Sequence, residues 1–342
     1  MAAVTVDPQL LAGPSGRPAL EALIDELEGR PTLVCFDGAW PSDVGSDTRS
    51  ALRHLPALSV AVRCPDPALA IAFDLATADA DALQELRDGF ERAPYAAVTA
   101  ALLLRSSPDD TWAGLVAESS AYSLLQSGPE FRRWLASGCR PPAADDDRPR
   151  VQLERRGKVG EVVLSRGSRH NALDVRTRDE LHARLRELAS GSGPIVLRAE
   201  GPSFCAGGDL GEFGTAAGPV QAHIVRVTRS LALLMSELAP RVVVALHGAC
   251  IGAGIELPAF ATRTVAADDA RFALPELTLG LLPGAGGTVS VRRRVGPARL
   301  LELLLSGEPI DAATAQGWGL VDEVVPRDQL LDRVYEIAEA RT

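Results

Sequence analysis

The chain has 342 residues, 46% of them hydrophobic, which is enough apolar material for one large core or two smaller ones. Its formal net charge of −10 argues against a general binder of nucleic acid or of an anionic membrane, because the long-range field repels phosphate groups. Lys158 is the single lysine, which argues against Schiff-base chemistry and lysine-dependent phosphate loops, so arginine must make any contact with an anion.

The cysteines and the N-terminus favour a cytoplasmic protein. The five cysteines are far apart and form no CxxC spacing, so neither a zinc site nor a disulfide framework is expected. The first residues, MAAVTVDPQLLAGPSG, lack the basic start and the apolar run of a secretory signal. The most apolar window, residues 242–261, contains His247, Glu256 and Pro258 and suits a buried strand and helix better than a membrane span. We therefore expect no bound metal and no membrane partner.

The chain divides into two predicted domains. Residues 1–140 are rich in alanine, with helices expected over residues 20–27 and 109–137, and their polar side chains form no obvious site. The segment RPPAADDDRPR, residues 140–150, combines prolines with an acidic run, which is typical of an exposed linker. We therefore expect an N-terminal domain over residues 1–140, a linker over 141–150 and a catalytic domain over 151–342.

The second domain alternates strands with helices. Apolar runs predict strands over residues 160–165, 194–198, 241–246 and 320–325, and helical spacing predicts helices over residues 177–188, 220–238, 311–317 and 327–340. Strands that alternate with helices indicate an α/β fold.

Two glycine-rich turns of this domain are candidates for an oxyanion hole. In GPSFCAGGDLGEF, residues 201–213, small residues before Asp209 let a ligand approach the backbone closely. In HGACIGAGIELPAF, residues 247–260, Ala253 precedes a helix expected to begin at Ile255, and a helix N-terminus offers unpaired N–H groups and a positive dipole end. On spacing alone, the first turn could equally be an ordinary strand-to-loop turn.

Two glutamates lie beside glycine-rich turns. Glu256 falls in the first turn of the expected helix among apolar residues, where a carboxylate without a partner needs a reason. Glu276 follows a proline and precedes residues 284–287, which we interpret as a tight turn into a helix. Two nearby carboxyl groups in a water-poor pocket can hold different protonation states, so that one donates a proton and the other accepts one. Adding water across a double bond next to a carbonyl requires such a pair.

Other chemistries fit the sequence less well. Thr288 is not preceded by lysine, and residues 252–254 lack the third glycine and the downstream acid of a dinucleotide fingerprint. Residues 201–205 lack the closing glycine of a nucleophile elbow, which argues against a serine hydrolase. His247 is therefore interpreted as a hydrogen-bonded core histidine or a strand cap.

Four motifs in order resemble the enoyl-CoA hydratase/isomerase, or crotonase, superfamily: RHNALD (169–174), SFCAGGDL (203–210), HGACIGAGIEL (247–257) and LPELTLGLLPGAGGT (274–288). The resemblance covers residues 151–340 and implies a spiral of ββα units, with a trimer or a hexamer as the usual homo-oligomer. It also implies that coenzyme A enters only as part of an acyl-CoA thioester substrate, without a separate cofactor.

The resemblance implies a role for particular residues. The two oxyanion donors fall on the N–H groups of Ala206 and Ala253, where Ala253 replaces a common glycine but keeps the donor. The catalytic carboxyl groups fall on Glu256 and Glu276, and having both favours a hydratase, since isomerases of this family often keep only the acid that matches Glu276. Coenzyme A and the acyl group are expected to contact Ala172, Leu173, Gly207, Gly208, Asp209, Leu210 and Phe213.

The N-terminal domain has no simple counterpart in that family. Residues 94–141 resemble the helices that normally follow the position of Val325, so we expect these helices to have moved ahead of the core. Residues 31–42 and 55–76 resemble core segments, and we interpret the domain as a smaller, degenerate crotonase-like half. Chance similarity between alanine-rich strands is the alternative. Asp74 stands at the position of Glu256 and no second acid follows, so no catalysis is expected there.

The predicted function is therefore an enoyl-CoA hydratase. One alternative is an enoyl-CoA isomerase or another biosynthetic enzyme that acts on CoA thioesters, because the superfamily reuses such acid pairs. A second alternative is a non-catalytic partner subunit whose N-terminal half binds a related enzyme.

Overall fold

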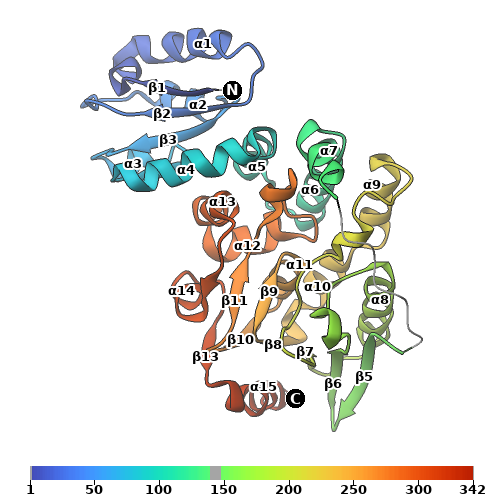
Figure 1. Cartoon of the computed structure of the whole chain (residues 1–342). Coiled ribbons are helices and arrows are strands. Elements are labelled where there is room, and N and C mark those ends of the chain that lie inside the picture. Colours follow the sequence, from blue (N-terminus) through green and yellow to red (C-terminus); the bar gives the residue numbers. More distant parts are fainter. Residues whose placement is uncertain (1, 139–147, 342) are drawn as a thin grey trace.

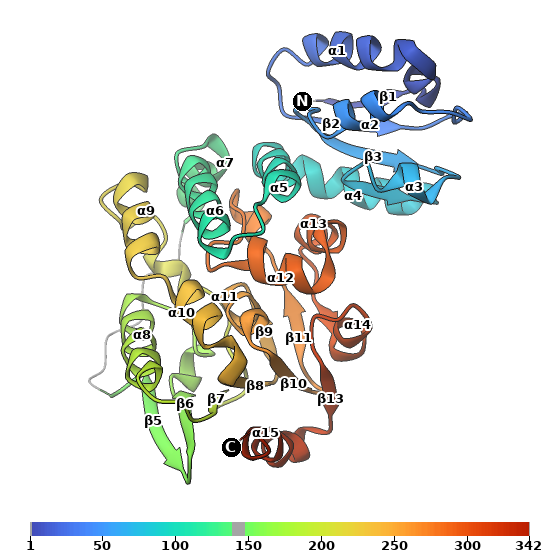
Figure 2. The same ribbon diagram turned by 180° about the vertical axis from the view of Figure 1, so that it is seen from behind.

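The protein was analysed as a computed structural model that describes residues 2–138 and 148–341, so most of the linker predicted over 141–150 lies outside the described residues. Two α/β units are joined by a layer of helices (Figures 1 and 2). Within the described part of the chain, no helix is long and apolar enough to cross a membrane.

The N-terminal unit is a four-stranded parallel sheet whose strands follow the chain order, with β1 (Ala2–Val6), β2 (Thr32–Phe36), β3 (Leu58–Val62) and β4 (Leu75–Thr77). The short connections contain α1 (Gly16–Glu26), α2 (Ser46–Leu52) and α3 (Pro67–Ala70). Alternate residues of β2 serve two different cores, since Val34 packs with Leu20 of α1 whereas Leu33 packs with the cluster that contains Ala97 of α5. Helices thus cover both faces of the sheet, as parallel sheets require.

The layer of helices follows β4 and comprises α4 (Ala80–Arg92), α5 (Pro94–Ser106), α6 (Thr111–Gln126) and α7 (Pro129–Ala136). The helical structure expected over residues 109–137 is confirmed, and it is divided into α6 and α7 because Pro129 cannot donate a backbone hydrogen bond and starts α7 after Gly128. One cluster of buried residues runs from the N-terminal sheet through α5 and α6 into the second unit. Helices that precede the second unit in the chain therefore share a hydrophobic core with it.

The second unit is built on a six-stranded sheet in the order β13-β10-β8-β7-β6-β5, in which only β5 and β6 pair antiparallel. A smaller sheet has the order β12-β11-β9. The strands are β5 (Val151–Arg156), β6 (Val159–Leu164), β7 (Ile195–Ala199), β8 (Val242–Leu246), β9 (Ala249–Ile251), β10 (Arg263–Ala267), β11 (Arg271–Ala273), β12 (Ile310–Asp311) and β13 (Glu323–Val325).

Helices cover both faces of the large sheet (Figure 1). Helix α15 packs Val334 and Ala338 against Val243 and Val265 on one face, and α8 and α10 pack on the other. The long helix expected over residues 220–238 is wrong, because the Ser230 side chain accepts from the Leu233 N–H and starts a new helix. The helices are α8 (Val175–Ala189), α9 (Pro219–Thr228), α10 (Leu231–Leu238), α11 (Ala253–Glu256), α12 (Gly287–Val295), α13 (Pro297–Ser306), α14 (Ala312–Gly317) and α15 (Leu330–Glu339).

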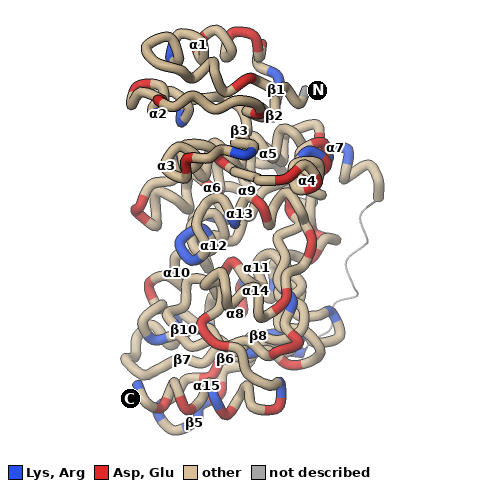
Figure 3. Tube along the Cα trace, turned by 90° about the vertical axis from the view of Figure 1, so that its left-hand side faces the viewer, with Lys and Arg blue, Asp and Glu red and all other residues tan. Residues whose placement is uncertain are grey.

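Acidic and basic residues are interspersed along the trace of both units (Figure 3). Asp74, which was predicted to correspond to Glu256, is tied to Arg105 of α5 by a 2.5 Å contact between Oδ1 and Nε. Asp74 Oδ2 also accepts from the N–H of Ser59 at 2.7 Å. The charge of Asp74 is therefore balanced by an ion pair and a hydrogen bond inside the N-terminal unit.

Candidate active site

The two predicted glutamates meet because their strands are neighbours. Strand β9 ends before Gly252, and β11, which pairs with β9 in parallel, ends just before the turn Glu276–Leu279. The carboxyl ends of parallel strands lie at the same edge of a sheet, so Glu256 and Glu276 are brought together. A methyl group placed on Gly252 would lie 2.8 Å from Glu276 Oε1 and 3.9 Å from Glu256 Oε1. Both carboxyl groups therefore face Gly252.

The two carboxyl groups are held differently. Glu256 Oε2 accepts from the N–H groups of Ala285 at 2.8 Å and Gly287 at 2.9 Å. Gly287 must be glycine because a Cβ atom there would lie 2.8 Å from Glu256 Cγ. Glu276 Oε2, in contrast, is buried without a hydrogen-bond partner among the described residues. One carboxyl group is thus fixed by the glycine-rich turn, and the other has spare hydrogen-bonding capacity.

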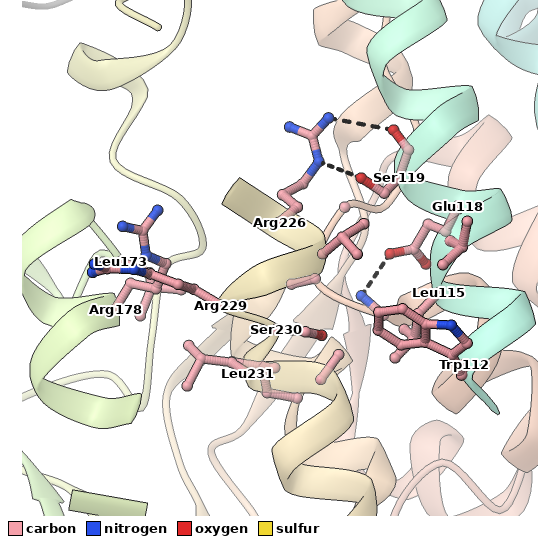
Figure 4. Close-up of a pocket in the computed structure, with 17 residues that line it drawn as sticks. Trp112, Leu115, Glu118, Ser119, Leu173, Arg178, Arg226, Arg229, Ser230 and Leu231 are labelled. Atoms are coloured by element: carbon pink, nitrogen blue, oxygen red, sulfur yellow. Dashed lines mark hydrogen bonds between the residues drawn. The ribbon is translucent and has the colours of Figure 1, made fainter. Parts of the chain in front are cut away.

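A third carboxyl group, Glu118 of α6, lies beside this pair. Its Oε1 accepts from the Gly286 N–H at 2.7 Å, and its Oε2 accepts from the Thr288 N–H at 2.8 Å and from Thr288 Oγ1 at 2.6 Å. Figure 4 shows Glu118 reaching from α6 toward this turn. The polar residues of the N-terminal domain form no obvious site in the sequence, but the structure brings one of them, Glu118, to the turn that holds Glu256.

A sequence signal for this third carboxyl group existed. Leu115, Glu118, Tyr122 and Leu125 follow one another at intervals of three or four residues, which places them on one face of a helix. Leu115 and Leu125 are buried, so an acid on the same face had to be buried as well. What the sequence did not show is which segment this face would contact.

All three carboxyl groups hold protons more tightly than ordinary glutamates. Burial raises the pKa of Glu118 to about 7, although the Thr288 hydroxyl opposes this change, and burial raises the pKa of Glu276 to about 8. The pKa of Glu256 is raised well above its usual range by burial and by repulsion from Glu276 and Glu118. Near neutral pH the cluster can therefore offer both a proton donor and a proton acceptor.

These raised pKa values predict that the protein becomes less stable as pH rises through neutrality. Above the unfolded glutamate pKa of about 4.3, the native state keeps protons on Glu118 and Glu276 that the unfolded chain has lost, up to their folded pKa values of about 7 and 8. We expect urea denaturation between pH 6.5 and pH 8.5 to show a falling free energy of unfolding, and a smaller fall in the double variant Glu118→Gln/Glu276→Gln. Parallel curves for the two proteins would contradict this prediction.

Titration of His247 contributes little to the change in stability between pH 6.5 and pH 8.5. Burial lowers the pKa of His247 to about 4, and its Nε2 lies 3.1 Å from the Gly201 carbonyl. Because its folded pKa is lowered, His247 reduces stability only as pH falls below the unfolded histidine pKa of about 6.5. The interpretation of His247 as a hydrogen-bonded core residue is confirmed.

The first oxyanion donor requires a correction. The N–H of Ala206 already donates to the His170 carbonyl at 2.9 Å, so the prediction that Ala206 supplies a free donor is wrong. The Leu173 N–H donates to Gly207 O, and Leu173 O accepts from Asp209 N–H. In this parallel bridge the N–H of the residue between them, Gly208, points away from Leu173, and no acceptor for it is present in residues 2–138 or 148–341.

The second predicted donor has the expected setting. The Gly252 N–H donates to the Ala273 carbonyl, and α11 begins at Ala253, two residues earlier than expected. The N–H of Ala253 has no acceptor within the described part of the chain, as is typical of the first residue of a helix. Gly208 and Ala253 both line the cavity that contains the two glutamates, so together they can receive one oxyanion.

This cavity has a volume of about 630 Å³ and collects most of the predicted contact residues. Ala172 does not line the cavity. The Asp209 carboxylate forms an ion pair with Arg166 Nη1 at 3.1 Å, so its charge is balanced within the cavity wall. Tyr122 and Gln126 of α6 complete the wall, which the sequence did not predict. The predicted residues that line the cavity are Leu173, Gly207, Gly208, Asp209, Leu210 and Phe213.

The wall at Phe213 is supported by the N-terminal half of the chain. Trp134 of α7 meets Phe213 edge to face with ring centroids 5.9 Å apart, and Phe131 stacks on Trp134 at 5.7 Å. Such aromatic contacts fix ring positions as well as bury area. Helices α6 and α7 thus shape the cavity from one side.

Comparisons with known proteins match the second unit of the chain. Residues 154–341 match the family model described as enoyl-CoA hydratase/isomerase. Probable enoyl-CoA hydratases (echA8) of Mycobacterium bovis and Mycobacterium tuberculosis are each 34% identical over 185 residues, which cover 53% of this chain and 70% of the relative.

Solved structures of enoyl-CoA hydratases also superimpose on this chain. An enoyl-CoA hydratase from Thermoplasma volcanium superimposes with a TM-score of 0.52 and 30% identity, over 56% of this chain and 78% of the other. An enoyl-CoA hydratase from Mycobacterium smegmatis superimposes with a TM-score of 0.52 and 31% identity, over 56% and 76% of the two chains. The N-terminal sheet lies outside the residues that match the family model.

Proposed function

Because the chain belongs to the enoyl-CoA hydratase/isomerase family, we propose that it is an enoyl-CoA hydratase, which adds water across the α,β double bond of an acyl-CoA thioester. The observation that carries the proposal is the pair of carboxyl groups, Glu256 and Glu276, that both face Gly252 in one cavity. A water molecule held between two such groups can lose a proton to one of them while the other protonates the substrate.

The thioester carbonyl oxygen is placed between the N–H groups of Gly208 and Ala253, which stabilise the enolate that forms during addition. Burial and repulsion raise the pKa of Glu256, and the two N–H groups on its Oε2 oppose this change. We assign the acceptor role to Glu256 on this geometry, because Oε2 of Glu276 has no such donors among the described residues. Glu276, with a pKa of about 8, is the donor. Water oxygen bonds to C3 and gives its proton to Glu256, while Glu276 delivers a proton to C2.

Coenzyme A is proposed to enter as part of the substrate along Leu173, Gly207 and Leu210, so that no separate cofactor takes part. The acyl group then lies toward Phe213 and α6, where Tyr122 and Gln126 line the cavity. The trimer or hexamer stays a prediction.

The test is hydration of crotonyl-CoA and longer 2-enoyl-CoAs in H₂¹⁸O. A hydratase incorporates ¹⁸O at C3 and yields 3-hydroxyacyl-CoA, which mass spectrometry detects. No hydration of any enoyl-CoA by protein that binds acyl-CoA in a thermal-shift assay would contradict the proposal.

An enoyl-CoA isomerase is the second candidate. It is favoured because Glu256 and Glu276 differ in the hydrogen bonds that their carboxyl groups accept. Glu256 Oε2 accepts two N–H groups, whereas Glu276 Oε2 has no hydrogen-bond partner among the described residues, so Glu276 is the better placed acid to carry a proton between C2 and C4. This alternative predicts that a 3-enoyl-CoA is converted to a 2-enoyl-CoA without ¹⁸O incorporation. Absence of turnover, with a second protein co-purifying, would instead indicate a partner subunit.

A further inference from the structure

We propose that Glu118 is a positioning residue for the acid pair, contributed by the N-terminal half of the chain. It fixes the turn that holds Glu256 and places a third negative charge beside the pair. This inference rests on the proposed hydration for its kinetic test only, because its geometry and its effect on proton binding do not depend on the substrate.

The carboxyl groups of Glu118 and Glu256 accept hydrogen bonds from alternate residues of the same turn. Four consecutive N–H groups, from Ala285 to Thr288, donate alternately to Glu256, Glu118, Glu256 and Glu118, at 2.7 to 2.9 Å. This turn begins α12, whose N-terminal N–H groups would otherwise lack acceptors. Moving Glu118 therefore moves the same short segment that positions Glu256 Oε2.

Glu118 is itself held rigidly. It is 2% exposed, and the Thr288 hydroxyl adds a further hydrogen bond at 2.6 Å. Every one of these contacts is a donor to Glu118, so these hydrogen bonds favour its carboxylate form and oppose the burial that raises its pKa. A buried side chain with three donors specifies a single position.

Charged groups around Glu118 belong to the same cluster. Arg226 of α9 lowers the pKa of Glu118, and its guanidinium is anchored to Ser119 Oγ at 3.0 Å (Figure 4). Tyr122 lies one turn along α6, and Glu256 and Glu276 face Glu118 from α11 and from the turn after β11. Through this proximity Glu118 raises the pKa of both acids. Its charge therefore helps to keep one of them protonated near neutral pH.

The decisive variant is Glu118→Gln, compared with Glu130→Gln as a matched control. Glu130 of α7 is also buried and also accepts two backbone N–H groups, from Tyr95 at 2.8 Å and Ala96 at 3.0 Å, but it lies outside the acid cluster. For Glu118→Gln we expect kcat for hydration to fall about tenfold with KM changed less than about twofold. The pH profile of kcat should move to lower pH, and Glu130→Gln should match the wild type.

Thr288→Val provides a second variant if Glu118→Gln does not fold. It removes the hydroxyl that lowers the pKa of Glu118 but leaves the backbone donor in place, so a smaller shift in the same direction is expected. A pH profile that superimposes on the wild type in both variants overturns the inference.

An infrared titration of the protonated carboxyl band separates this inference from the proposed function. Removing the charge of Glu118 should move the titration of the remaining buried carboxyl groups to lower pH, whether or not the protein turns over an enoyl-CoA. If the band moves and no hydration occurs, the proposed function fails and the positioning role stands. If hydration occurs and the band stays in place, the positioning role fails.

Discussion

Replacing Glu276 by glutamine should lower kcat for enoyl-CoA hydration about a thousandfold, because a positioned general acid contributes about 10²- to 10⁴-fold. Glutamine keeps the size of the side chain but cannot deliver a proton to C2. Glu276 Oε2 has no hydrogen-bond partner among residues 2–138 and 148–341, so the substitution breaks no buried hydrogen bond of that oxygen. The loss should therefore appear in kcat, measured by the decrease in enoyl-CoA absorbance.

Glu256→Gln provides the companion measurement. The glutamine carbonyl oxygen can still accept from Ala285 and Gly287, so the turn keeps its acceptor while the base is lost. Both variants should bind a saturated acyl-CoA as the wild type does, which shows that the cavity is intact. Hydration that survives both substitutions would remove the acid pair from the mechanism, and loss in Glu276→Gln alone would favour the isomerase.

Replacing Gly252 by alanine should have the other large effect, with hydration reduced at least about a hundredfold because the water site is displaced. The new methyl group would lie 2.8 Å from Glu276 Oε1, in the space that both carboxyl groups face. Gly252 also has φ +51° and ψ −122°, which side chains disfavour, so the melting temperature should fall as well.

The control for this substitution is Gly317→Ala in α14, where no atom lies within 4 Å of the new Cβ and φ is not positive. Activity and melting temperature should stay close to the wild type in that variant. Activity retained in Gly252→Ala would mean that the space between the two carboxyl groups is not where the reaction takes place.

The N-terminal half gives this site features that residues 154–341, which match the family model, do not contain. Glu118, Tyr122 and Trp134 come from α6 and α7, and they contact the glycine-rich turn, the cavity and Phe213 respectively. Helices that precede the family-matching residues in the chain thus contact the site from one side. Descent of the N-terminal sheet from a second core stays a prediction.

The sequence by itself determined the family and the α/β fold of the second domain. Four motifs in the right order are specific because each encodes a local requirement, such as glycine at Gly287 where Glu256 approaches the backbone. The comparisons confirm both predictions. Strand and helix positions followed from apolar periodicity, and the long helix predicted over residues 220–238 failed where a local signal interrupts it, at Ser230.

Only the tertiary structure decided which groups meet. Ala206 and Gly208 are both small and lie two residues apart. The N–H of Ala206 donates to His170, which is distant in sequence, whereas the N–H of Gly208 has no acceptor among the residues that the structure describes. Glu118 is separated from Thr288 by 170 residues. No local sequence pattern therefore predicts that its carboxylate accepts hydrogen bonds from the turn that holds Glu256. Periodicity reports that a side chain is buried, whereas its partner depends on how distant segments pack. The acid pair was therefore predictable, and the residue that positions it was not.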